Sequence, residues 1–583
     1  MRNSGSLDRR RGILGTAVVV FALLATTLAA APAPAASSCS SQPAVFPEAQ
    51  IRAGMTGTGL TTIEGTTPTR FDVEILGVMP DYIWLGIDVV VARMTGPQSF
   101  LDEVGGAFYG MSGSPVYIDG KLVGAVSYAV SGDPTIFGLT PAQAMVDMFN
   151  LSKAGAVRLP ERIAFDPATR RTVARALGVP ASQAPSGLQR IPTYLGVSGL
   201  STGQLRRFQD VLDRNHAGMH VAPAAGMSAG LPVSSVPFAP GQPIGSVLSW
   251  GDATIWTAGT VTLTCGSKLI AYGHTLFGSP PGDVTIGMTG AEVLAVGSGG
   301  GIWPGDMVPV LTEPRGTFTQ DRFAGSVGTV GTSPEVTPIT SSFSSPDTGL
   351  SRDGKTEAIY QAGFWFPEIV WSHMIGNLGA VAQRIGDGTL SIAYTIEGLT
   401  AEGMPFTIEN RTMVYSDYDA MYAAYKLVDA VYQLAYNKFE KVTFTGIHAA
   451  GEITQQQLRG TITRVRTASS LQPKLAQRSL LKVRPGDKIT IETTLTPLDG
   501  GPNVITKMQM KVPSWAGGFE TIMLRGGKER FVSPPRSFDE LLAHLSGGEH
   551  PNDLIATGFG TQTSRAQDLV VKGKAFLTVQ VVR

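Results

Sequence analysis

Residues 109–129 read YGMSGSPVYIDGKLVGAVSYA, and this stretch says most about the fold. Two apolar arms, Val116–Ile118 and Lys121–Tyr128, flank the dipeptide Asp119-Gly120. A two-residue primed turn needs positive φ at both positions, so Asp-Gly between such arms predicts a β-hairpin. A glycine-flanked serine, Ser112, comes just before the first arm. The serine is therefore expected on a tight turn at the start of the hairpin.

The glycines around this serine suggest a chemical role for the turn. They let the backbone bend so that amide N–H groups converge near the hydroxyl, where an oxyanion would develop. Chymotrypsin-like peptidases place their nucleophile in such a turn. By that analogy Ser112 is the nucleophile, and the N–H groups of Gly110 and Ser112 are the oxyanion donors. The strand that ends in Val126, Ser127 and Tyr128 would be the edge along which an extended substrate pairs. The alternative is a structural turn serine in a glycine-rich β protein.

The motif also resembles one particular family. GMSGSP (residues 110–115) with its hairpin, the preceding Gly105-Gly106 and the following GLTP (residues 138–141) are similar to SpoIVB-type peptidases, named for a stage IV sporulation protein. The resemblance covers roughly Gly54–Phe149 and, more weakly, Pro240–Gly331. It implies a serine endopeptidase with a narrow signalling or processing role. It implies a protein or peptide substrate, and neither a metal nor an organic cofactor.

The resemblance extends to a candidate base. AYGH (residues 271–274) is similar to the family's Gly-His element, which carries the catalytic histidine and so implies this role for His274. In the family the histidine precedes the serine, whereas here Ser112 comes first. A circularly permuted pair of barrels would give this order, and catalytic geometry does not depend on chain order. The alternative is a structural Gly-His element in a protein whose first barrel has lost its chemistry. The other six histidines are interpreted as ordinary hydrogen-bonded residues.

The acidic group that would orient the imidazole is left open. In the family it precedes the serine within a short segment, but the corresponding place here, residues 96–98, reads Gly-Pro-Gln and has no acid. We favour Asp88, in the predicted strand Ile87–Val91. The other candidates are Asp102, Asp283 and Asp321. A Ser–His dyad without an acid is the remaining alternative.

Composition limits the class of protein. The chain has 583 residues, so three or four domains are expected. Only 16% of residues are charged, while Gly (70) and Pro (38) are abundant, which is typical of secreted β-rich proteins. Lys and Arg together number 46, and Asp and Glu together also number 46. This balance gives no reason to expect nucleic-acid binding.

The N-terminus resembles a targeting segment. Arg9–Arg11 precede the apolar run Ile13–Ala31, which ends in small residues and prolines. Residues 1–36 are therefore predicted to be a signal peptide, cut near Ala36, that sends the protein outside the cell or to the cell envelope. A twin-arginine signal and an uncleaved membrane anchor are the alternatives. No later run reaches the ~18 apolar residues that span a bilayer.

The sequence has two cysteines, Cys39 and Cys265. Export would allow a disulfide between them, which would tie the mature N-terminus to the second β domain. Two unpaired thiols are the alternative. Neither HExxH nor Cys-x-x-Cys occurs, so no metal motif is recognised.

We expect a mainly β protein with two chymotrypsin-like β-barrels, in permuted order if both are catalytic, followed by an α+β or β-sandwich region. The expected parts are a first barrel (45–155), a helical connector or inserted domain (156–238), a second barrel (239–335), a linker and helical region (336–440) and a β-sandwich-like module (441–583). Within them, helices are predicted at Asp166–Leu177, Thr202–Arg214, Val370–Ile385, Asp417–Tyr436 and Ser537–Leu545. The Ser/Thr/Pro/Gly-rich segment Thr337–Lys355 is predicted to be a linker or long loop.

The function expected from these features is that of an exported serine endopeptidase, with a cell-envelope partner as a further expectation. The alternative is a secreted, catalytically inactive scaffold that binds a peptide or cell-wall partner.

Overall fold

The computed structural model describes residues 44–151, 160–215, 219–224, 238–276, 282–298, 305–359, 365–528, 534–564 and 567–583. The predicted signal peptide, its cleavage site and Cys39 lie outside these residues. Among these described residues, no helix is both long and apolar enough to cross a bilayer.

The first part is a closed six-stranded antiparallel barrel. Its strands run in the ring order β1-β2-β3-β6-β5-β4, and the pairing of β4 with β1 closes it. The strands are β1 (Thr56–Thr61), β2 (Thr69–Trp84), β3 (Ile87–Gly96), β4 (Pro115–Ile118), β5 (Lys121–Ala129) and β6 (Ile136–Pro141). Asp119 (φ 49°) and Gly120 (φ 72°) both take positive φ between β4 and β5, so the predicted hairpin is confirmed.

A second six-stranded antiparallel barrel follows. Its ring order is β11-β12-β13-β17-β16-β14, closed by the pairing of β11 with β14. The strands are β11 (Pro243–Gly251), β12 (Ile255–Cys265), β13 (Lys268–Ala271), β14 (Gly282–Ser298), β16 (Gly316–Arg322) and β17 (Gly325–Val330). β15 (Gly305–Leu311) pairs with the far half of β14. The predicted fold class, mainly β with two chymotrypsin-like barrels, is confirmed.

Short helices pack beside the first barrel. They are α1 (Gln98–Val104), α2 (Ala142–Asp147) and the 3-10 turns η1 (Glu48–Gln50) and η2 (Met148–Asn150). Of these, α2 and η2 also contact the second barrel. Side chains from β2, β3, β5 and α1 fill the barrel, with Phe71, Phe100 and Phe137 in ring contact at its centre.

The connector between the barrels extends both of them. β7 (Arg162–Ala164) and β8 (Gly187–Arg190) add to β5, while β9 (Thr193–Val197) and β10 (Met219–Pro223) add to β12. The two predicted helices are confirmed as α3 (Pro167–Leu177) and α4 (Thr202–Asn215). Asp166 caps α3 by accepting hydrogen bonds from the amides of Ala168 and Thr169.

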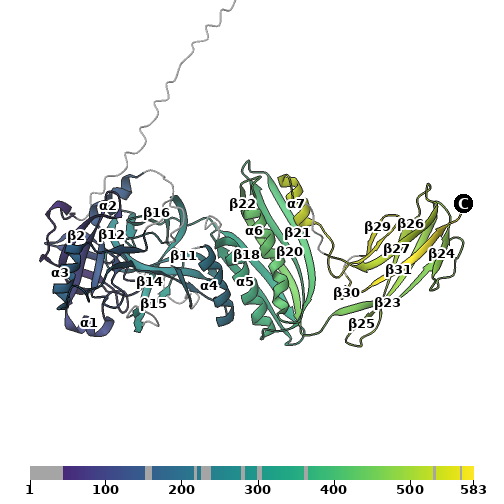
Figure 1. Cartoon of the computed structure of the whole chain (residues 1–583), viewed down its shortest axis with the longest axis horizontal. Helices are drawn as coiled ribbons and strands as arrows, with labels where there is room; N and C mark the ends of the chain where they lie inside the picture. The colour runs from purple at the N-terminus through teal and green to yellow at the C-terminus, as the bar shows by residue number, and fades with distance from the viewer. Residues whose placement is uncertain are drawn as a thin grey trace, which may run out of the picture. The chain divides into compact units, whose positions relative to one another are not determined.

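The segment 337–454 forms a sheet covered by helices. The strand order is β19-β18-β22-β20-β21. The strands are β18 (Thr337–Ser345), β19 (Leu350–Ala358), β20 (Gly388–Thr400), β21 (Pro405–Ser416) and β22 (Val442–Thr454). Helices α5 (Trp365–Ala382) and α6 (Tyr425–Ala435), the latter preceded by η5 (Ala420–Ala424), lie on one face of this sheet (Figure 1).

The prediction of a linker at 337–355 is wrong, because this segment forms the hairpin β18–β19. In β18, residues 337, 339, 341, 343 and 345 are buried, and three of these are Ser or Thr. Small polar residues on the buried face hid the period-2 pattern that predicts a strand.

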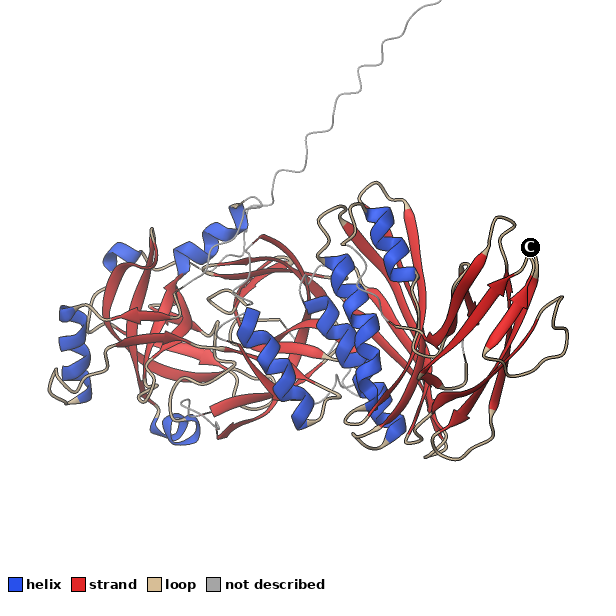
Figure 2. Cartoon of the chain, turned by 45° about the vertical axis from the view of Figure 1, so that its right-hand side comes forward, coloured by secondary structure: helices blue, strands red, loops and turns tan. Residues whose placement is uncertain are grey.

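A β-sandwich ends the chain (Figure 2). One sheet has the order β26-β25-β23-β30 and the other β24-β31-β27-β28-β29. The strands are β23 (Arg459–Ala468), β24 (Leu480–Val483), β25 (Lys488–Pro497), β26 (Val504–Lys511), β27 (Gly518–Gly526), β28 (Leu554–Thr557), β29 (Thr561–Ser564), β30 (Val570–Lys572) and β31 (Lys574–Val581). The sandwich begins after residue 454 rather than at 441, because β22 pairs with β18 and β20 of the preceding sheet.

One helix of the sandwich segment belongs to the preceding layer. α7 (Phe538–Ser546) begins at Ser537, whose hydroxyl accepts from the Glu540 amide as the predicted capping pattern requires. Leu541 and Leu545 of α7 join the core formed by α5, α6 and their sheet. The chain thus returns from the sandwich to cover β21.

Candidate active site

Ser112 and His274 meet where the two barrels join. The distance from Ser112 Oγ to His274 Nε2 is 2.9 Å, and Nδ1 of the same ring lies 2.8 Å from the Thr275 carbonyl oxygen. A carbonyl only accepts, so Nδ1 carries the proton and donates it to this bond. In the neutral ring Nε2 is then an acceptor for the Ser112 hydroxyl. This is the tautomer that a general base acting on the serine needs.

The serine turn is fixed against the second barrel by its glycine. Gly113 has φ 98°, and a Cβ at this position would overlap the Thr260 carbonyl oxygen and the Tyr272 amide nitrogen. The Thr262 hydroxyl donates to the Gly113 carbonyl at 2.7 Å. Only glycine permits both the backbone conformation and this close approach.

Strand β12 holds the carbonyl groups of the turn. The Thr260 hydroxyl donates to the Gly110 carbonyl at 2.8 Å, and the Thr260 amide donates to the Ser112 carbonyl at 2.8 Å. The amides of Met111, Gly113 and Ser114 donate within the first barrel. The amides of Gly110 and Ser112 donate to no group among the described residues. The two predicted oxyanion donors are thus backbone amides that remain available in this part of the structure.

The histidine sits on a strained turn. Tyr272 (φ 71°) and Gly273 (φ 68°) both adopt left-handed backbone conformations, which is unusual for a tyrosine. The buried Tyr272 hydroxyl bonds to the Ser246 hydroxyl at 2.7 Å, and the Thr140 hydroxyl donates to the Gly273 carbonyl at 2.7 Å. Anchors from both barrels therefore hold the backbone just before His274.

A carboxylate acts on His274 through one peptide group. Asp321 Oδ1 accepts a hydrogen bond from the Leu276 amide at 2.8 Å and another from the Ser326 hydroxyl at 2.9 Å. The Leu276 N–H and the Thr275 C=O belong to the same peptide group, so Asp321 and His274 bond to its two ends. Hydrogen bonds in such a chain polarise one another. The group that orients the imidazole is therefore a backbone carbonyl, supported by a buried aspartate.

Asp88, the acid favoured from the sequence, is not a hydrogen-bond partner of His274, so that prediction is wrong. Asp88 accepts from the Asp81 amide at 2.9 Å and lies beside Glu48. Burial and the neighbouring Asp88 raise the pKa of Glu48 to about 7. β3 directs Asp88 towards the η1 end of the barrel, away from the partners of the imidazole.

The other acids considered have different surroundings. Asp102 accepts from the Gln98 side chain on the exposed side of α1. The Asp283 side chain lies outside the described residues, while its backbone pairs with Gln320.

The predicted substrate edge is already paired, so that prediction is also wrong. Tyr128 pairs with Arg190 of β8, and the Ser127 carbonyl accepts from the Ile191 amide. The Val126 carbonyl accepts from the Gly113 amide. All three residues of the predicted edge are buried. The connector strand, whose pairing partner the sequence did not reveal, occupies the position assigned to substrate.

The environment of His274 disfavours its charged form. Burial, together with the charge of Arg190, lowers the pKa of His274 to about 3, although the bond to the Thr275 carbonyl acts in the opposite direction. Arg190 Nη1 also donates to the Thr275 hydroxyl at 3.2 Å. The imidazole is neutral at physiological pH, as a proton acceptor must be.

The pair is closed off from solvent in this conformation. Ser112 is 4% exposed and His274 is 1% exposed. Met307 lies against Gly110, and the neighbouring Tyr109 ring contacts Tyr194 edge-on at a centroid distance of 3.9 Å. Because Ser112 and His274 are both buried, a substrate can reach the serine only if the surrounding side chains move.

Sequence reasoning missed the groups that complete this arrangement. The Thr275 carbonyl carries no side-chain signature, because any residue after His274 would supply one. Thr260 has no motif of its own and lies within the predicted strand sequence AGTVTLT (residues 258–264), which forms part of β12. Cys265 is disulfide-bonded; its one potential partner in the chain, Cys39, lies outside the described residues. Within the described ranges, no cluster of three or more His, Cys, Asp or Glu side chains could hold a metal ion.

Comparison with known proteins relates part of the chain to a known family. Neither the curated proteins nor the solved structures include a match to this chain. Residues 25–145 match the model of the SpoIVB peptidase S55 family. That range contains the GMSGSP turn and Ser112, whereas His274 lies beyond it. Over the segment that forms the first barrel, the chain is thus similar to the SpoIVB peptidase S55 family.

Proposed function

We propose that this protein is an exported serine endopeptidase in which Ser112 is the nucleophile and His274 the general base. The observation that carries the proposal is the 2.9 Å contact between Ser112 Oγ and His274 Nε2, in the tautomer that accepts the serine proton. The family match over the serine-bearing segment supports the reaction class.

The reaction follows from this geometry. Ser112 Oγ attacks the carbonyl carbon of a peptide bond while its proton passes to His274 Nε2. The amides of Gly110 and Ser112 donate to the oxyanion that forms. His274 then returns the proton to the departing amine, leaving an acyl-serine. A water molecule gives a proton to His274 and attacks the acyl group, which releases the acid and restores the serine.

The imidazolium that forms in each step needs support, because the free site disfavours a charged ring. The Thr275 carbonyl accepts from Nδ1, and Asp321 bonds to the other end of that peptide group. These linked hydrogen bonds spread part of the developing positive charge towards a buried carboxylate. No metal or organic cofactor enters the proposed reaction.

The substrate is a protein or peptide that reaches Ser112 only after the side chains around the buried serine and histidine move. A closed site of this kind suits selective cleavage rather than bulk digestion. The apolar run at residues 13–31 supports export, and secretion or retention at the cell envelope with a partner there belongs to the same proposal.

A second candidate function is a peptidase-like scaffold without activity. The near-complete burial of Ser112 and His274 favours it, because a binding protein has no need for an accessible serine.

A fluorophosphonate probe that acylates active serines separates the two functions. The peptidase predicts covalent labelling of the wild type, none of Ser112→Ala, and labelling of His274→Gln slowed by about a thousandfold or more. Melting temperatures of the three proteins, measured in parallel, check that each is folded. Equal labelling of wild type and Ser112→Ala, or a folded wild type that is never labelled, would count against the peptidase.

A further inference from the structure

Strand β5 contacts both of the turns that carry the reactive side chains. The Gly113 amide of the serine turn donates to the Val126 carbonyl at 2.8 Å. A Cβ added to Gly273, just before His274, would come within 3.3 Å of the Ser127 Cβ. Val126 and Ser127 therefore touch the serine turn and the histidine turn together. Whatever pairs with the next residues of β5 lies beside both turns.

The strand that pairs there is β8, in an antiparallel register. Residues 189–190 face residues 128–129. The Ile191 amide donates to the Ser127 carbonyl at 3.0 Å, whereas the Arg190 amide points the other way and donates to the Glu161 carbonyl at 2.8 Å. Amides alternate in direction along a strand, so the Gln189 amide points to β5 as that of Ile191 does. An extended peptide adds to a strand edge by the same alternating bonds.

Arg190 brings β8 next to the histidine turn. Its Nη1 donates to the Thr275 hydroxyl at 3.2 Å. After burial, the charge of Arg190 is the second cause of the lowered pKa of His274. Proton transfer from Ser112 makes the imidazole positive, so a fixed cation nearby opposes the reaction. β8 therefore disfavours catalysis electrostatically, in addition to filling the edge of β5.

The strand is bound without being positioned for cleavage. The amides of Gly110 and Ser112 donate to no group among the described residues, so they do not hold the Ile191 carbonyl. The next peptide bond joins Ile191 to Pro192, whose nitrogen carries no hydrogen and belongs to a ring. An occupant of this kind fills the edge without being converted to product, which is the property of an inhibitor.

The first barrel does not need β8 in order to close. β5 pairs with β6 at five positions and with β4 at four, but with β8 at only two. The ring of the barrel runs through β4 and β6 and does not include β8. The other edge of β8 pairs with β7. The two connector strands can therefore separate from β5 by local opening, which costs less free energy than unfolding the barrel.

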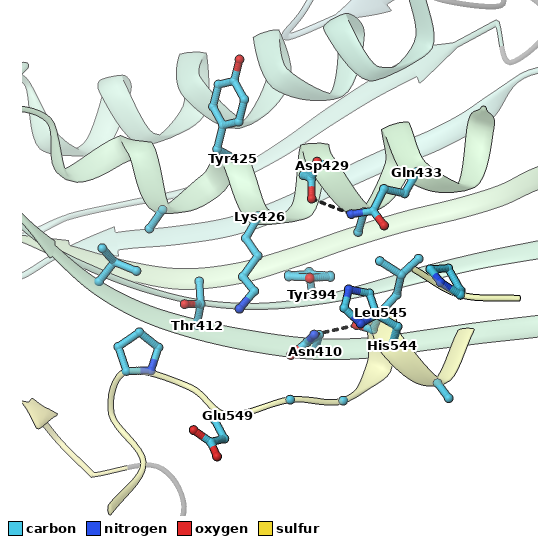
Figure 3. Close-up of a pocket in the computed structure, with 18 of the residues that line it drawn as sticks. Tyr394, Asn410, Thr412, Tyr425, Lys426, Asp429, Gln433, His544, Leu545 and Glu549 are labelled. Carbon is cyan, nitrogen blue, oxygen red and sulfur yellow. Dashed lines mark hydrogen bonds between the residues drawn. The ribbon is translucent and has the colours of Figure 1, made fainter. Parts of the chain in front are cut away.

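A large pocket elsewhere in the chain is separate from this arrangement. It has a volume of about 1100 Å³ and is enclosed by α6, by β20 and β21, and by the segment 534–551 (Figure 3). None of its lining residues belongs to either barrel. Two of its polar side chains bond within the pocket, since Asp429 accepts from Gln433 and Asn410 donates to the Leu545 carbonyl. The pocket therefore has no part in blocking the serine.

We propose that residues 189–191 act as an internal inhibitor of the serine site, bound in the place of an extended peptide substrate. The inference rests on the peptidase function proposed above. The predicted substrate edge is closed in the described conformation, and displacement of β8 opens it. The substrate is then an extended protein segment that pairs with residues 127–129. Ile191 is fully buried in the apolar core of the first barrel. The substrate residue that replaces it, on the acyl side of the cleaved bond, is therefore apolar.

Labelling with a peptide probe tests the inhibitor. The probe is a tripeptide diphenyl phosphonate with the sequence of residues 189–191, in which phosphorus replaces the last carbonyl carbon. Gln189→Pro removes an amide that points to β5 and leaves the apolar core unchanged. We expect this variant to be labelled about tenfold faster than the wild type, because β8 is displaced for more of the time.

Gln509→Pro is the matched control, because it makes the same substitution in β26, a terminal strand of the sandwich. It should be labelled at the wild-type rate. Ile191→Ala is a second opened variant, which shortens the buried side chain of the inhibitory segment and should also speed labelling. Adding Ser112→Ala to Gln189→Pro should abolish labelling. Melting temperatures show that each variant is folded.

A second probe tests the substrate class. It carries aspartate in place of the isoleucine and should label Gln189→Pro at least tenfold more slowly than the first probe does, because the place of Ile191 is apolar. Equal rates for the two probes would show that the apolar preference is wrong.

The outcomes separate this inference from the peptidase assignment. If the wild type and both opened variants are labelled at equal rates, the internal inhibitor is overturned while the peptidase assignment stands. Acceleration of Gln509→Pro to the same degree would also overturn it, because general loosening of the fold would then be the cause. Labelling of no variant by either probe would count against the peptidase itself, and the inhibitor would fall with it.

Discussion

Ser112 Oγ lies 2.9 Å from His274 Nε2, although 162 residues separate the two in the chain. The serine belongs to the first barrel and the histidine follows β13 of the second. Backbone contacts between Thr260 and the serine turn bring them together. The distance between the serine and the histidine therefore depends on the interface between the barrels. Substitutions at that interface should reduce fluorophosphonate labelling as strongly as substitutions of the two residues.

Gly113→Ala tests this interface. Alanine at this position would have to adopt the positive φ that favours glycine. Its Cβ would also overlap the Thr260 carbonyl oxygen. We expect a loss of about 3 kcal/mol in the free energy of unfolding and loss of fluorophosphonate labelling. Urea unfolding and probe labelling measure the two effects.

Gly120→Ala is the matched control, because Gly120 also has positive φ but nothing lies within 4 Å of the added Cβ. It should cost only about 1 kcal/mol and keep labelling intact. Equal losses for the two variants would show that backbone strain alone, and not contact between the barrels, sets the effect.

Asp321→Asn tests the link through the 275–276 peptide. The amide can still accept from the Leu276 N–H, but the negative charge is gone. We expect labelling about tenfold slower with near-native Tm, and a further large loss for Asp321→Ala, which removes the acceptor.

Asp102→Asn is the control for this pair, since Asp102 accepts a hydrogen bond from Gln98 on the exposed side of α1. If Asp321 only stabilised the fold, the labelling rate of each variant would fall only as far as its Tm falls. Slower labelling of Asp321→Asn at an unchanged Tm, with a larger loss for Asp321→Ala, would therefore exclude a purely structural role.

The pH dependence of labelling should reflect the depressed pKa of His274. A histidine with its ordinary pKa of 6.5 would be half-protonated at that pH, whereas burial and Arg190 lower the pKa of His274 to about 3. The labelling rate should therefore stay level as pH falls from 7.5 to 5. Arg190→Gln removes one cause of the lowered pKa, so the pH at which labelling begins to slow on acidification should be higher in this variant. A wild-type rate that halves near pH 6.5 would contradict this explanation.

His373 makes a separate prediction about stability. Burial lowers its pKa to about 4, and its ring nitrogens bond to the hydroxyls of Thr356 and Ser341. Below pH 6.5 the unfolded chain takes up a proton that the folded chain does not. The stability contributed by this group is therefore complete above pH 6.5 and falls with acidification, by at most about 1.4 kcal/mol per pH unit.

Two carboxyls act in the opposite sense, because burial raises the pKa values of Glu48 and Glu368 to about 7. The histidine effect is therefore measured as the difference in unfolding free energy between wild type and His373→Gln from pH 7.5 to 5. That difference should shrink as the pH falls. A constant difference would show that His373 does not titrate in this range.

Local features of the fold could be predicted because neighbouring residues determine them. Asp119-Gly120 takes positive φ in a two-residue turn, Asp166 caps α3 and Ser537 caps α7, each as its sequence pattern indicates. Patterns failed where small polar residues occupy buried positions, as in β18. The Ser- and Thr-rich sequence of this strand is like that of a linker. Its buried face is recognisable only in the folded structure, where α5 packs against it.

The glycine-flanked serine on a turn before a hairpin, and the two β-barrels, could be predicted from the amino-acid sequence. The folded structure was needed to show that His274 reaches this serine, that a backbone carbonyl and Asp321 take the role expected of Asp88, and that β8 pairs with the predicted substrate edge. The difference is one of range along the chain. A turn is fixed by the φ preferences of two or three adjacent residues, whereas a contact across 162 residues depends on how two complete barrels close and meet.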